Sequence, residues 1–243
     1  MKEIYGKEIT DPSLLELEEL ALWYNEKIGN YPAIVGGWAV YFYTTGLGSK
    51  DIDVVFAGDK AKHQTLFAYF QSHGFKERQR SLFDREFYKE IVSGKRKVEI
   101  IVDAVSQNRI ILFEGRKARI PWAWAMKHSK EHKIGKATIL IPEIDILLIY
   151  KLGAALGRSD ILKTGLDFDY YRSKVWKDVY DVLSLAEIEL DANVVRKFLK
   201  ESGLDDYKEE ILQIIEDNFD DEMKGLLKNA TLGKIRMVLT GDG

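Results

Sequence analysis

The chain has 243 residues, of which 46% are apolar and 31% are charged, and its formal net charge is −3. This length suits one large domain or two small ones, and the composition is that of a globular protein. The negative net charge argues against a dominant electrostatic attraction to nucleic acid, and the absence of cysteine excludes a disulfide framework and a thiolate zinc site.

The sequence also argues against a membrane protein. No run approaches 18 apolar residues, so we expect no membrane-spanning segment and no membrane partner. Residues 1–8, Met-Lys-Glu-Ile-Tyr-Gly-Lys-Glu, lack the apolar core of a secretory signal. We therefore expect a cytoplasmic protein.

Helical and strand patterns alternate over the first 75 residues. Leucines at 14, 15, 17, 20 and 22, with glutamates between them, predict an amphipathic helix over residues 13–27. The next predicted segments are a strand over 32–35, a short helix over 38–45, a strand over 51–56 and a helix over 60–72.

The remaining patterns change character at residue 142. Before it, strands are predicted over 75–80, 85–92, 97–105, 110–113 and 138–141. After it the spacing is helical only, over 146–156, 176–186, 192–200, 208–217 and 220–229. Strands followed by a block of helices indicate an α+β protein. We predict a small mixed β-sheet core flanked by helices in residues 1–142 and a helical C-terminal domain in residues 143–243.

Residues 34–56 carry the strongest chemical signal. Gly36-Gly37 follows a predicted strand and opens a helix, so the backbone can approach an anion at the helix N-terminus. Asp51 and Asp53 are two apart on a predicted strand, so both carboxylates project from one side. Such charges, about 7 Å apart, repel by on the order of 2 kcal/mol, and a divalent cation reverses that sign. The alternative is a turn followed by two solvated aspartates.

The ordered set Gly36-Gly37 and Gly48-Ser49-Lys50-Asp51-Ile52-Asp53 resembles the signature of the DNA polymerase β-like nucleotidyltransferase superfamily. The resemblance implies that the core binds the triphosphate of ATP or another NTP together with two metal ions, Mg²⁺ or Mn²⁺. It assigns nucleotide binding to Gly36, Gly37, Ser49 and Lys50. It assigns metal binding and catalysis to Asp51 and Asp53.

A third carboxylate usually completes this kind of site, on a strand beside the Asp-x-Asp strand. Residues 98–104 offer the candidates Glu99 and Asp103, which are four apart and share one face of a regular strand. In similar proteins the third acid follows a polar and an apolar residue, as Glu99 follows Lys97-Val98. We therefore favour Glu99 as catalytic metal ligand over Asp103, and the further alternative is that both acids are incidental.

The second half, in Pro142–Leu152 and Trp176–Leu185, resembles the AbiEii-type nucleotidyltransferase toxins. In those proteins a helix with a lysine precedes a helix with an aspartate, and here Lys151 and Asp178 occupy these places. The resemblance implies that Lys151 neutralises the triphosphate and that Asp178 positions the lysine or the acceptor. Asp181 is the alternative to Asp178, because residues 160–174 form a longer separation than the family pattern has.

Without the resemblance, Lys151 is a lysine on an apolar helix that extends its ammonium to solvent. If Lys151 instead reaches the triphosphate, replacement of the desolvated cation by methionine should keep or raise thermal stability.

These resemblances imply transfer of an NMP from an NTP to an acceptor hydroxyl, with release of pyrophosphate. The acceptor could be an RNA 3′ end such as that of tRNA, a protein, or a small molecule such as an aminoglycoside or lincosamide. The role would be that of a toxin paired with an antitoxin protein, or a housekeeping one. The rival interpretation is a non-catalytic protein of the same fold that binds nucleotide or a partner.

One further motif is rejected. His128-Ser-Lys-Glu-His132 fits the zinc-hydrolase pattern H-x-x-E-H. The lysines at 127, 130 and 133 oppose a cation there, and Gly135 ends any helix early. The segment therefore predicts a solvated helix end and no metal site.

Overall fold

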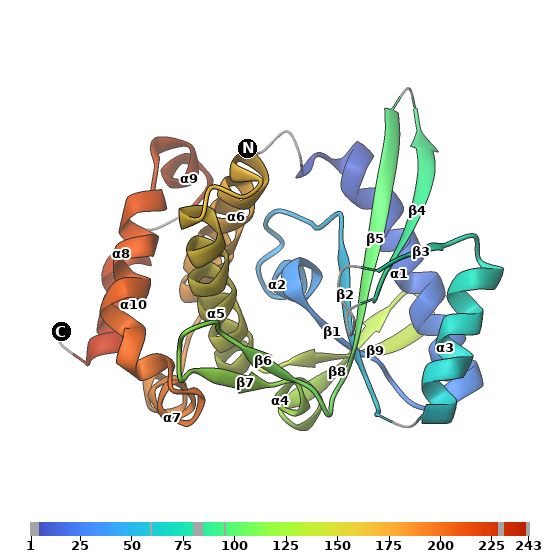
Figure 1. Cartoon of the computed structure of the whole chain (residues 1–243), viewed down its shortest axis with the longest axis horizontal. Coiled ribbons are helices and arrows are strands. Elements are labelled where there is room, and N and C mark those ends of the chain that lie inside the picture. The colour runs from blue at the N-terminus through green and yellow to red at the C-terminus, as the bar shows by residue number, and fades with distance from the viewer. Residues whose placement is uncertain (1–4, 59, 80–84, 95, 228–230, 242–243) are drawn as a thin grey trace. The chain divides into compact units, whose positions relative to one another are not determined.

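The computed structural model describes residues 5–58, 60–79, 85–94, 96–227 and 231–241 (Figure 1). These residues form a seven-stranded sheet, a separate two-stranded ribbon, and helices that lie before, between and after the strands along the chain. The predicted α+β class, a mixed sheet with flanking helices followed by a helical segment, is confirmed.

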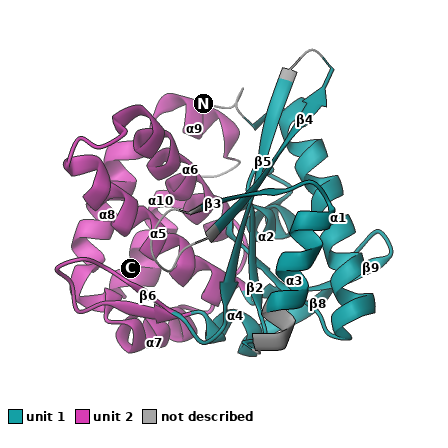
Figure 2. Cartoon of the chain, turned by 45° about the vertical axis from the view of Figure 1, so that its right-hand side comes forward, with its two compact units in different colours: residues 1–109, 122–143 teal, residues 110–121, 144–243 magenta. Residues whose placement is uncertain are grey.

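The chain forms two compact units, coloured separately in Figure 2. Unit 1 consists of residues 1–109 and 122–143, and unit 2 consists of residues 110–121 and 144–243. The chain therefore enters unit 2 twice, first for a short ribbon and then, one residue beyond the predicted boundary, for the helices.

The sheet of unit 1 has the strand order β3-β4-β5-β2-β1-β9-β8. Its strands are β1 (Ala33–Val35), β2 (Ile52–Phe56), β3 (Lys76–Gln79), β4 (Arg85–Ser93), β5 (Arg96–Ser106), β8 (Ser129–Ile134) and β9 (Ala137–Pro142). The sheet is mixed because β2 pairs parallel with β5 and β1 parallel with β9, whereas the other pairs are antiparallel. Residue 80 of the predicted strand 75–80 lies outside the described residues.

The helices of unit 1 are α1 (Lys7–Ile28), α2 (Gly36–Thr44), α3 (Lys60–Ser72) and α4 (Ala123–Lys127). One face of the sheet is covered by α1 and α3, which Figure 1 shows beside each other. Phe87 of β4 stacks on Phe70 of α3 with ring centroids 4.4 Å apart, and Lys89 pairs with Glu16 of α1. Because side chains alternate along a strand, the even-numbered residues of β4 point to the opposite face.

Helix α1 begins six residues earlier than predicted and is fixed at two places. The Asn25 side chain donates to the carbonyl of Thr138 on β9 at 2.8 Å and accepts from the Thr138 N–H at 2.7 Å. The buried indole of Trp38 on α2 donates to Ser13 at 3.0 Å. These contacts attach α1 both to the sheet and to the helix that follows the double glycine.

Unit 2 combines the ribbon β6 (Ile110–Leu112) and β7 (Arg119–Pro121) with helical segments. The helical segments are α5 (Ile144–Lys163), α6 (Phe168–Ala186), α7 (Ala192–Ser202), the 3₁₀ turn Leu204–Tyr207, α8 (Lys208–Asn218), α9 (Asp221–Leu226) and α10 (Thr231–Thr240). Helices α5 and α6 are longer than predicted, so only residues 164–167 connect them. The predicted helix 220–229 corresponds to α9, and its residues 228 and 229 lie outside the described residues. A Cβ on Gly153 would lie 2.6 Å from Ile120 Cδ1, so this glycine lets the ribbon pack closely on α5.

A charged cluster attaches the β6–β7 connection to the helices of unit 2. The Arg116 guanidinium donates to Asp160 at 2.7 and 2.8 Å and to Glu210 at 2.7 and 2.9 Å. Lys163 also donates to Glu210, at 2.8 Å. The hydrogen bonds from Arg116 and Lys163 lower the pKa of Glu210 to about 2.

The segment 129–134 is strand β8, so the prediction of a helix end at 128–132 is wrong. The strand carries mostly charged side chains that do not alternate with apolar ones, which hid it from sequence patterns. The His132 ring packs on Phe42 with centroids 4.8 Å apart. No helix among the described residues is both long enough and apolar enough to cross a membrane.

We predict that Asn25→Ala lowers the free energy of unfolding by about 1–3 kcal/mol, because the main chain of Thr138 loses two hydrogen bonds. Asn25→Asp keeps the shape and the acceptor but places a carboxylate against a carbonyl, so it should destabilise as well. Urea denaturation measures both changes. Wild-type stability in both variants would contradict the anchoring role.

Candidate functional site

The turn at Gly36 brings a helix N-terminus against a carboxylate. Gly36 is the first residue of α2 and has φ +66°, and a Cβ built on it would lie 1.8 Å from Asp53 Oδ2. No side chain caps this helix, whose N-cap residue is Val35. Uncapped N-terminal amides of a helix can bind anions, and the Asp53 carboxylate lies at this helix start.

The register of the sheet places acidic residues in one row. Asp53 of β2 pairs with Asp103 of β5, Asp103 pairs with Glu86 of β4, and Glu86 pairs with Arg78 of β3. Residues paired in register point to the same face, and neighbouring strands lie about 4.8 Å apart. The three carboxylates therefore lie on the face opposite to that covered by α1 and α3. We call this face, with Asp53, Asp103 and Glu86, the acidic face.

The two aspartates of the Asp-x-Asp motif differ in position. Asp53 lies within β2, whereas Asp51 lies at a bend one residue before the strand begins. Strand alternation therefore places Asp53 on the acidic face but does not by itself place Asp51 there. Ser49 and Lys50 belong to the same loop, in which Ser49 is buried.

The register also separates the two candidates for the third carboxylate. Asp103 is the direct neighbour of Asp53, whereas Glu99 lies four residues earlier, about 13 Å along the strand. Glu99 pairs in register with Glu90 and accepts a hydrogen bond from Arg78 at 3.0 Å. The structure thus brings Asp103, rather than the favoured Glu99, next to Asp53.

The acidic face suits a hard cation in its chemistry. Carboxylate oxygens are the ligands that Mg²⁺ prefers, and a substrate phosphate commonly supplies further oxygens. In the part of the chain that the structure describes, no three acidic, histidine or cysteine side chains are close enough to hold an ion as they stand. The pair Asp53 and Asp103 is therefore a partial ligand set that fits Mg²⁺ or Mn²⁺ in kind.

Unit 2 holds a second constellation, between α5 and α6. Lys151 Nζ lies 2.7 Å from Asp181 and 3.3 Å from Asp178. Arg158 pairs with Asp178, and Lys177 pairs with Asp181. Positive and negative groups thus alternate in the order Arg158, Asp178, Lys151, Asp181 and Lys177. In these contacts each of the two carboxylates pairs with two cations.

Burial makes these pairs electrostatically strong. Asp178 and Asp181 are fully buried, and the side chain of Lys151 is 8% exposed. Burial alone would lower the pKa of Lys151, but Asp181 and Asp178 outweigh it and raise that pKa. Burial lowers the pKa of Lys177, against the attraction of Asp181. Burial would raise the pKa of Asp178, but Arg158 and Lys151 outweigh it and lower that pKa.

The pairing overturns one expectation about Lys151. Its ammonium does not extend to solvent along an apolar helix, because two aspartates of α6 hold it in the interior. The sequence presented Asp178 and Asp181 as alternatives, and both contact the lysine. Lys151 and Asp178 belong to unit 2, whereas the glycine turn and the acidic face belong to unit 1.

Sequence patterns did not single out four charged residues of these clusters. Arg158 follows Lys151 by two helical turns, and Lys177 precedes Asp181 by one, so helical spacing could have indicated both. Arg78 and Glu86 lie on separate strands, and only the pairing of β3 with β4 brings them together.

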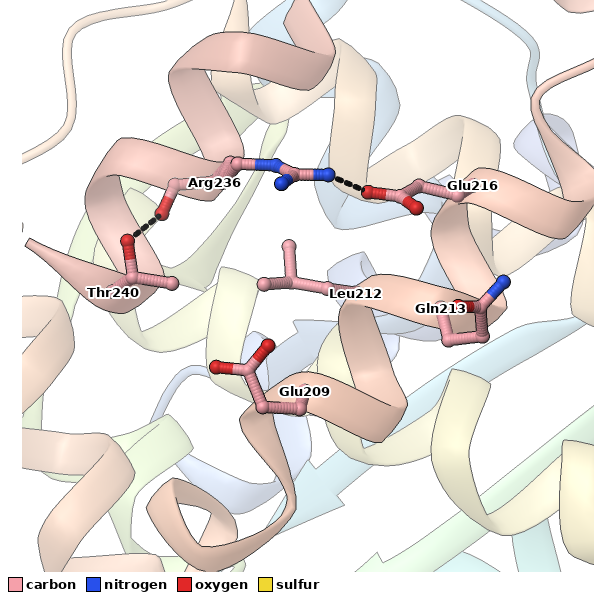
Figure 3. Close-up of a pocket in the computed structure, with 6 residues that line it drawn as sticks. All are labelled: Glu209, Leu212, Gln213, Glu216, Arg236 and Thr240. Atoms are coloured by element: carbon pink, nitrogen blue, oxygen red, sulfur yellow. Dashed lines mark hydrogen bonds and ion pairs between the residues drawn. The ribbon is translucent and has the colours of Figure 1, made fainter. Parts of the chain in front are cut away.

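A shallow hollow in unit 2 holds none of these residues. Figure 3 shows its lining by α8 and α10, with Arg236 paired to Glu216 and with Leu212 between the helices. The lining residues are Glu209, Leu212, Gln213, Glu216, Arg236 and Thr240. This surface provides no arrangement that resembles a reactive centre.

No family model matches this chain, and no curated protein matches it. Among solved structures, JHP933 from Helicobacter pylori is 12% identical, with 93% of this chain and 88% of that chain covered and a TM-score of 0.48.

Two further similar structures are transferases by name. The lincomycin-bound lincosamide antibiotic adenylyltransferase LnuA is 16% identical, with coverage of 58% and 85% and a TM-score of 0.37. ANT(2″)-Ia in complex with adenylyl-2″-tobramycin is 14% identical, with coverage of 73% and 98% and a TM-score of 0.41. At these low identities and TM-scores no functional conclusion follows for this chain.

We predict that Gly36→Ala destabilises the protein by about 1–3 kcal/mol more than Gly29→Ala. Both glycines have positive φ, but a Cβ at Gly29 meets nothing within 4 Å, whereas one at Gly36 meets Asp53. The difference between the two variants therefore isolates the collision with the carboxylate. Chemical denaturation measures it, and equal losses would show that Asp53 does not pack against this turn.

Lys151→Met should lower the free energy of unfolding by on the order of 3–5 kcal/mol, because it leaves two buried carboxylates short of a cation. This reverses the expectation that methionine keeps or raises stability. Lys163→Met, on the same helix, should cost less than about 1 kcal/mol, since Lys163 is 60% exposed.

Thermal or urea unfolding compares the two lysine variants. The contribution of Asp178 to stability has a defined pH window, because Arg158 and Lys151 hold its folded pKa below the ordinary value of 3.8. The stability that Asp178 adds is present above about pH 4 and is lost as the pH falls through its folded pKa. A Lys151→Met variant as stable as wild type would refute the buried pairing.

Proposed function

We propose that the protein is a metal-dependent nucleotidyltransferase that moves an NMP from an NTP to an acceptor hydroxyl and releases pyrophosphate. The observation that carries this proposal is the packing of Asp53 against the first residue of α2, with Asp103 as its neighbour in register. An anion site and a cation site that adjoin each other suit a metal-bound triphosphate.

In this proposal Asp53 and Asp103 hold Mg²⁺ or Mn²⁺, and Asp51 contributes from the bend before β2. The bound ion would neutralise phosphate charge during an in-line displacement. The amides of Gly36 and Gly37 at the start of α2 receive a phosphate, and Ser49 and Lys50 contact it from the loop between α2 and β2.

The acceptor hydroxyl must lose a proton when it attacks the α-phosphate. We assign the acceptance of that proton to Asp103, since a carboxylate beside the attacking group is a suitable general base. The remaining catalysis consists of orientation and charge stabilisation.

Three parts of the proposal rest on sequence resemblance alone. They are the contact of Lys151 with the triphosphate, supported by Asp178, the role as a toxin with an antitoxin partner, and the class of acceptor. RNA, a protein and a small molecule all remain candidate acceptors.

Label transfer tests the activity directly. The protein is incubated with each α-labelled NTP, Mg²⁺ and bulk RNA or cell lysate, and the products are separated on gels. We expect label to enter one acceptor class in a reaction that EDTA abolishes. Nucleotide binding without transfer to any acceptor would favour the rival, a non-catalytic binding protein.

The third carboxylate provides a sharper prediction. Asp103→Asn should reduce transfer by on the order of 100-fold or more, because it removes the group beside Asp53. Glu99→Gln should leave transfer close to wild type, because Glu99 lies far along the strand and is held by Arg78. This order reverses the preference for Glu99 drawn from the sequence. An inactive Glu99→Gln with an active Asp103→Asn would contradict the register argument.

A further inference from the structure

Arg78 on the edge strand β3 joins two acids from two other strands. Its Nη1 donates to Glu86 of β4 at 3.1 Å, and its Nη2 donates to Glu99 of β5 at 3.0 Å. The guanidinium also lies over the ring of Tyr88, 4.3 Å from the centroid. The side chain is 45% exposed, yet three contacts fix its plane against the sheet.

All the groups that Arg78 contacts lie on the acidic face. Glu86 neighbours Asp103 in register, and Tyr88 follows Glu86 by two residues on the same strand. Glu99 precedes Asp103 by four residues and therefore points to the same side. The face thus carries two kinds of acid. Glu86 and Glu99 share a guanidinium, whereas Asp53 adjoins the glycine turn and Asp103 is its neighbour in register.

We propose that Arg78 is a positioning residue that restricts which carboxylates of this face bind the divalent cation. It holds Glu86 and Glu99 in ion pairs and thereby leaves the cation to Asp53 and its neighbour Asp103. This inference rests on the proposed function, since it concerns the cation of the same site.

Two physical effects support this role. A carboxylate that accepts from a guanidinium is already compensated in charge, and one of its oxygens is already engaged in a hydrogen bond. A fixed positive charge on the same face also weakens the binding of a second cation nearby. Lysine could supply the charge but not the planar fork that reaches two acids on different strands.

Cation binding by the full chain tests the inference without reference to activity. Mn²⁺ is titrated by calorimetry and by electron paramagnetic resonance into wild type, Arg78→Gln and Arg78→Lys. We expect Arg78→Gln to bind Mn²⁺ on the order of fivefold to tenfold more tightly, or to bind an additional ion. Arg78→Lys should show a smaller increase, and it provides the test if Arg78→Gln does not fold.

Two control variants separate positioning from a general change in charge. Lys89→Gln removes a cation from the opposite face of the neighbouring strand β4 and should leave Mn²⁺ affinity unchanged. The double variant Arg78→Gln/Glu99→Gln should return part of the way toward wild type, because one of the two released acids is gone.

Unchanged Mn²⁺ affinity and stoichiometry in the folded Arg78 variants would overturn the inference while leaving the proposed function intact. An equal increase in Lys89→Gln would also overturn it. If wild type binds no Mn²⁺, or if Asp53→Asn binds Mn²⁺ as tightly as wild type does, the proposed function fails and the inference fails with it.

Discussion

The pairing of two like charges in register, Asp53 on β2 and Asp103 on β5, is the constraint on which the rest of unit 1 depends. The sheet enforces this pairing through its other face, where Ile52, Val54 and Val102 are almost completely buried. A slip of β2 by one residue would turn Asp53 toward the apolar core in place of Ile52 and Val54. The apolar core therefore fixes the register that forms the acidic row. The two carboxylates repel each other, and a bound cation or nearby main-chain amides would relieve that repulsion. The turn at Gly36 lies against Asp53.

In unit 2, by contrast, opposite charges lie next to each other. Its charges are buried between two helices, and each carboxylate there contacts two cations. Such an arrangement adds little net stability over apolar packing, but it makes the loss of one member costly. Its value is geometric, because the ammonium of Lys151 is held between Asp178 and Asp181. A lysine fixed in this way can present a defined positive charge to an anion.

Local signals predicted much of the fold, and pairing between distant strands explains most of what they missed. Gly36-Gly37 and Asp53 occupy the predicted turn and strand because each depends on neighbours within a few residues. The choice between Glu99 and Asp103 depends on the register of β2 against β5, which no local pattern contains. The same reason hid the bridge from Arg78 to Glu86 and Glu99. Strand β8 was missed because its charged residues lack alternation, although its pairing with β9 stabilises it.

The central claim is that the glycine turn and the aspartates form one site for a metal-bound nucleotide. Calorimetric titration of ATP and the other NTPs into the full chain, with Mg²⁺ and with EDTA, measures nucleotide affinity and its dependence on the metal ion. We expect NTP binding to weaken strongly in EDTA. In the Asp53→Asn variant we expect the same NTP affinity with Mg²⁺ and with EDTA. Equal affinity of the wild-type protein with Mg²⁺ and with EDTA would contradict it.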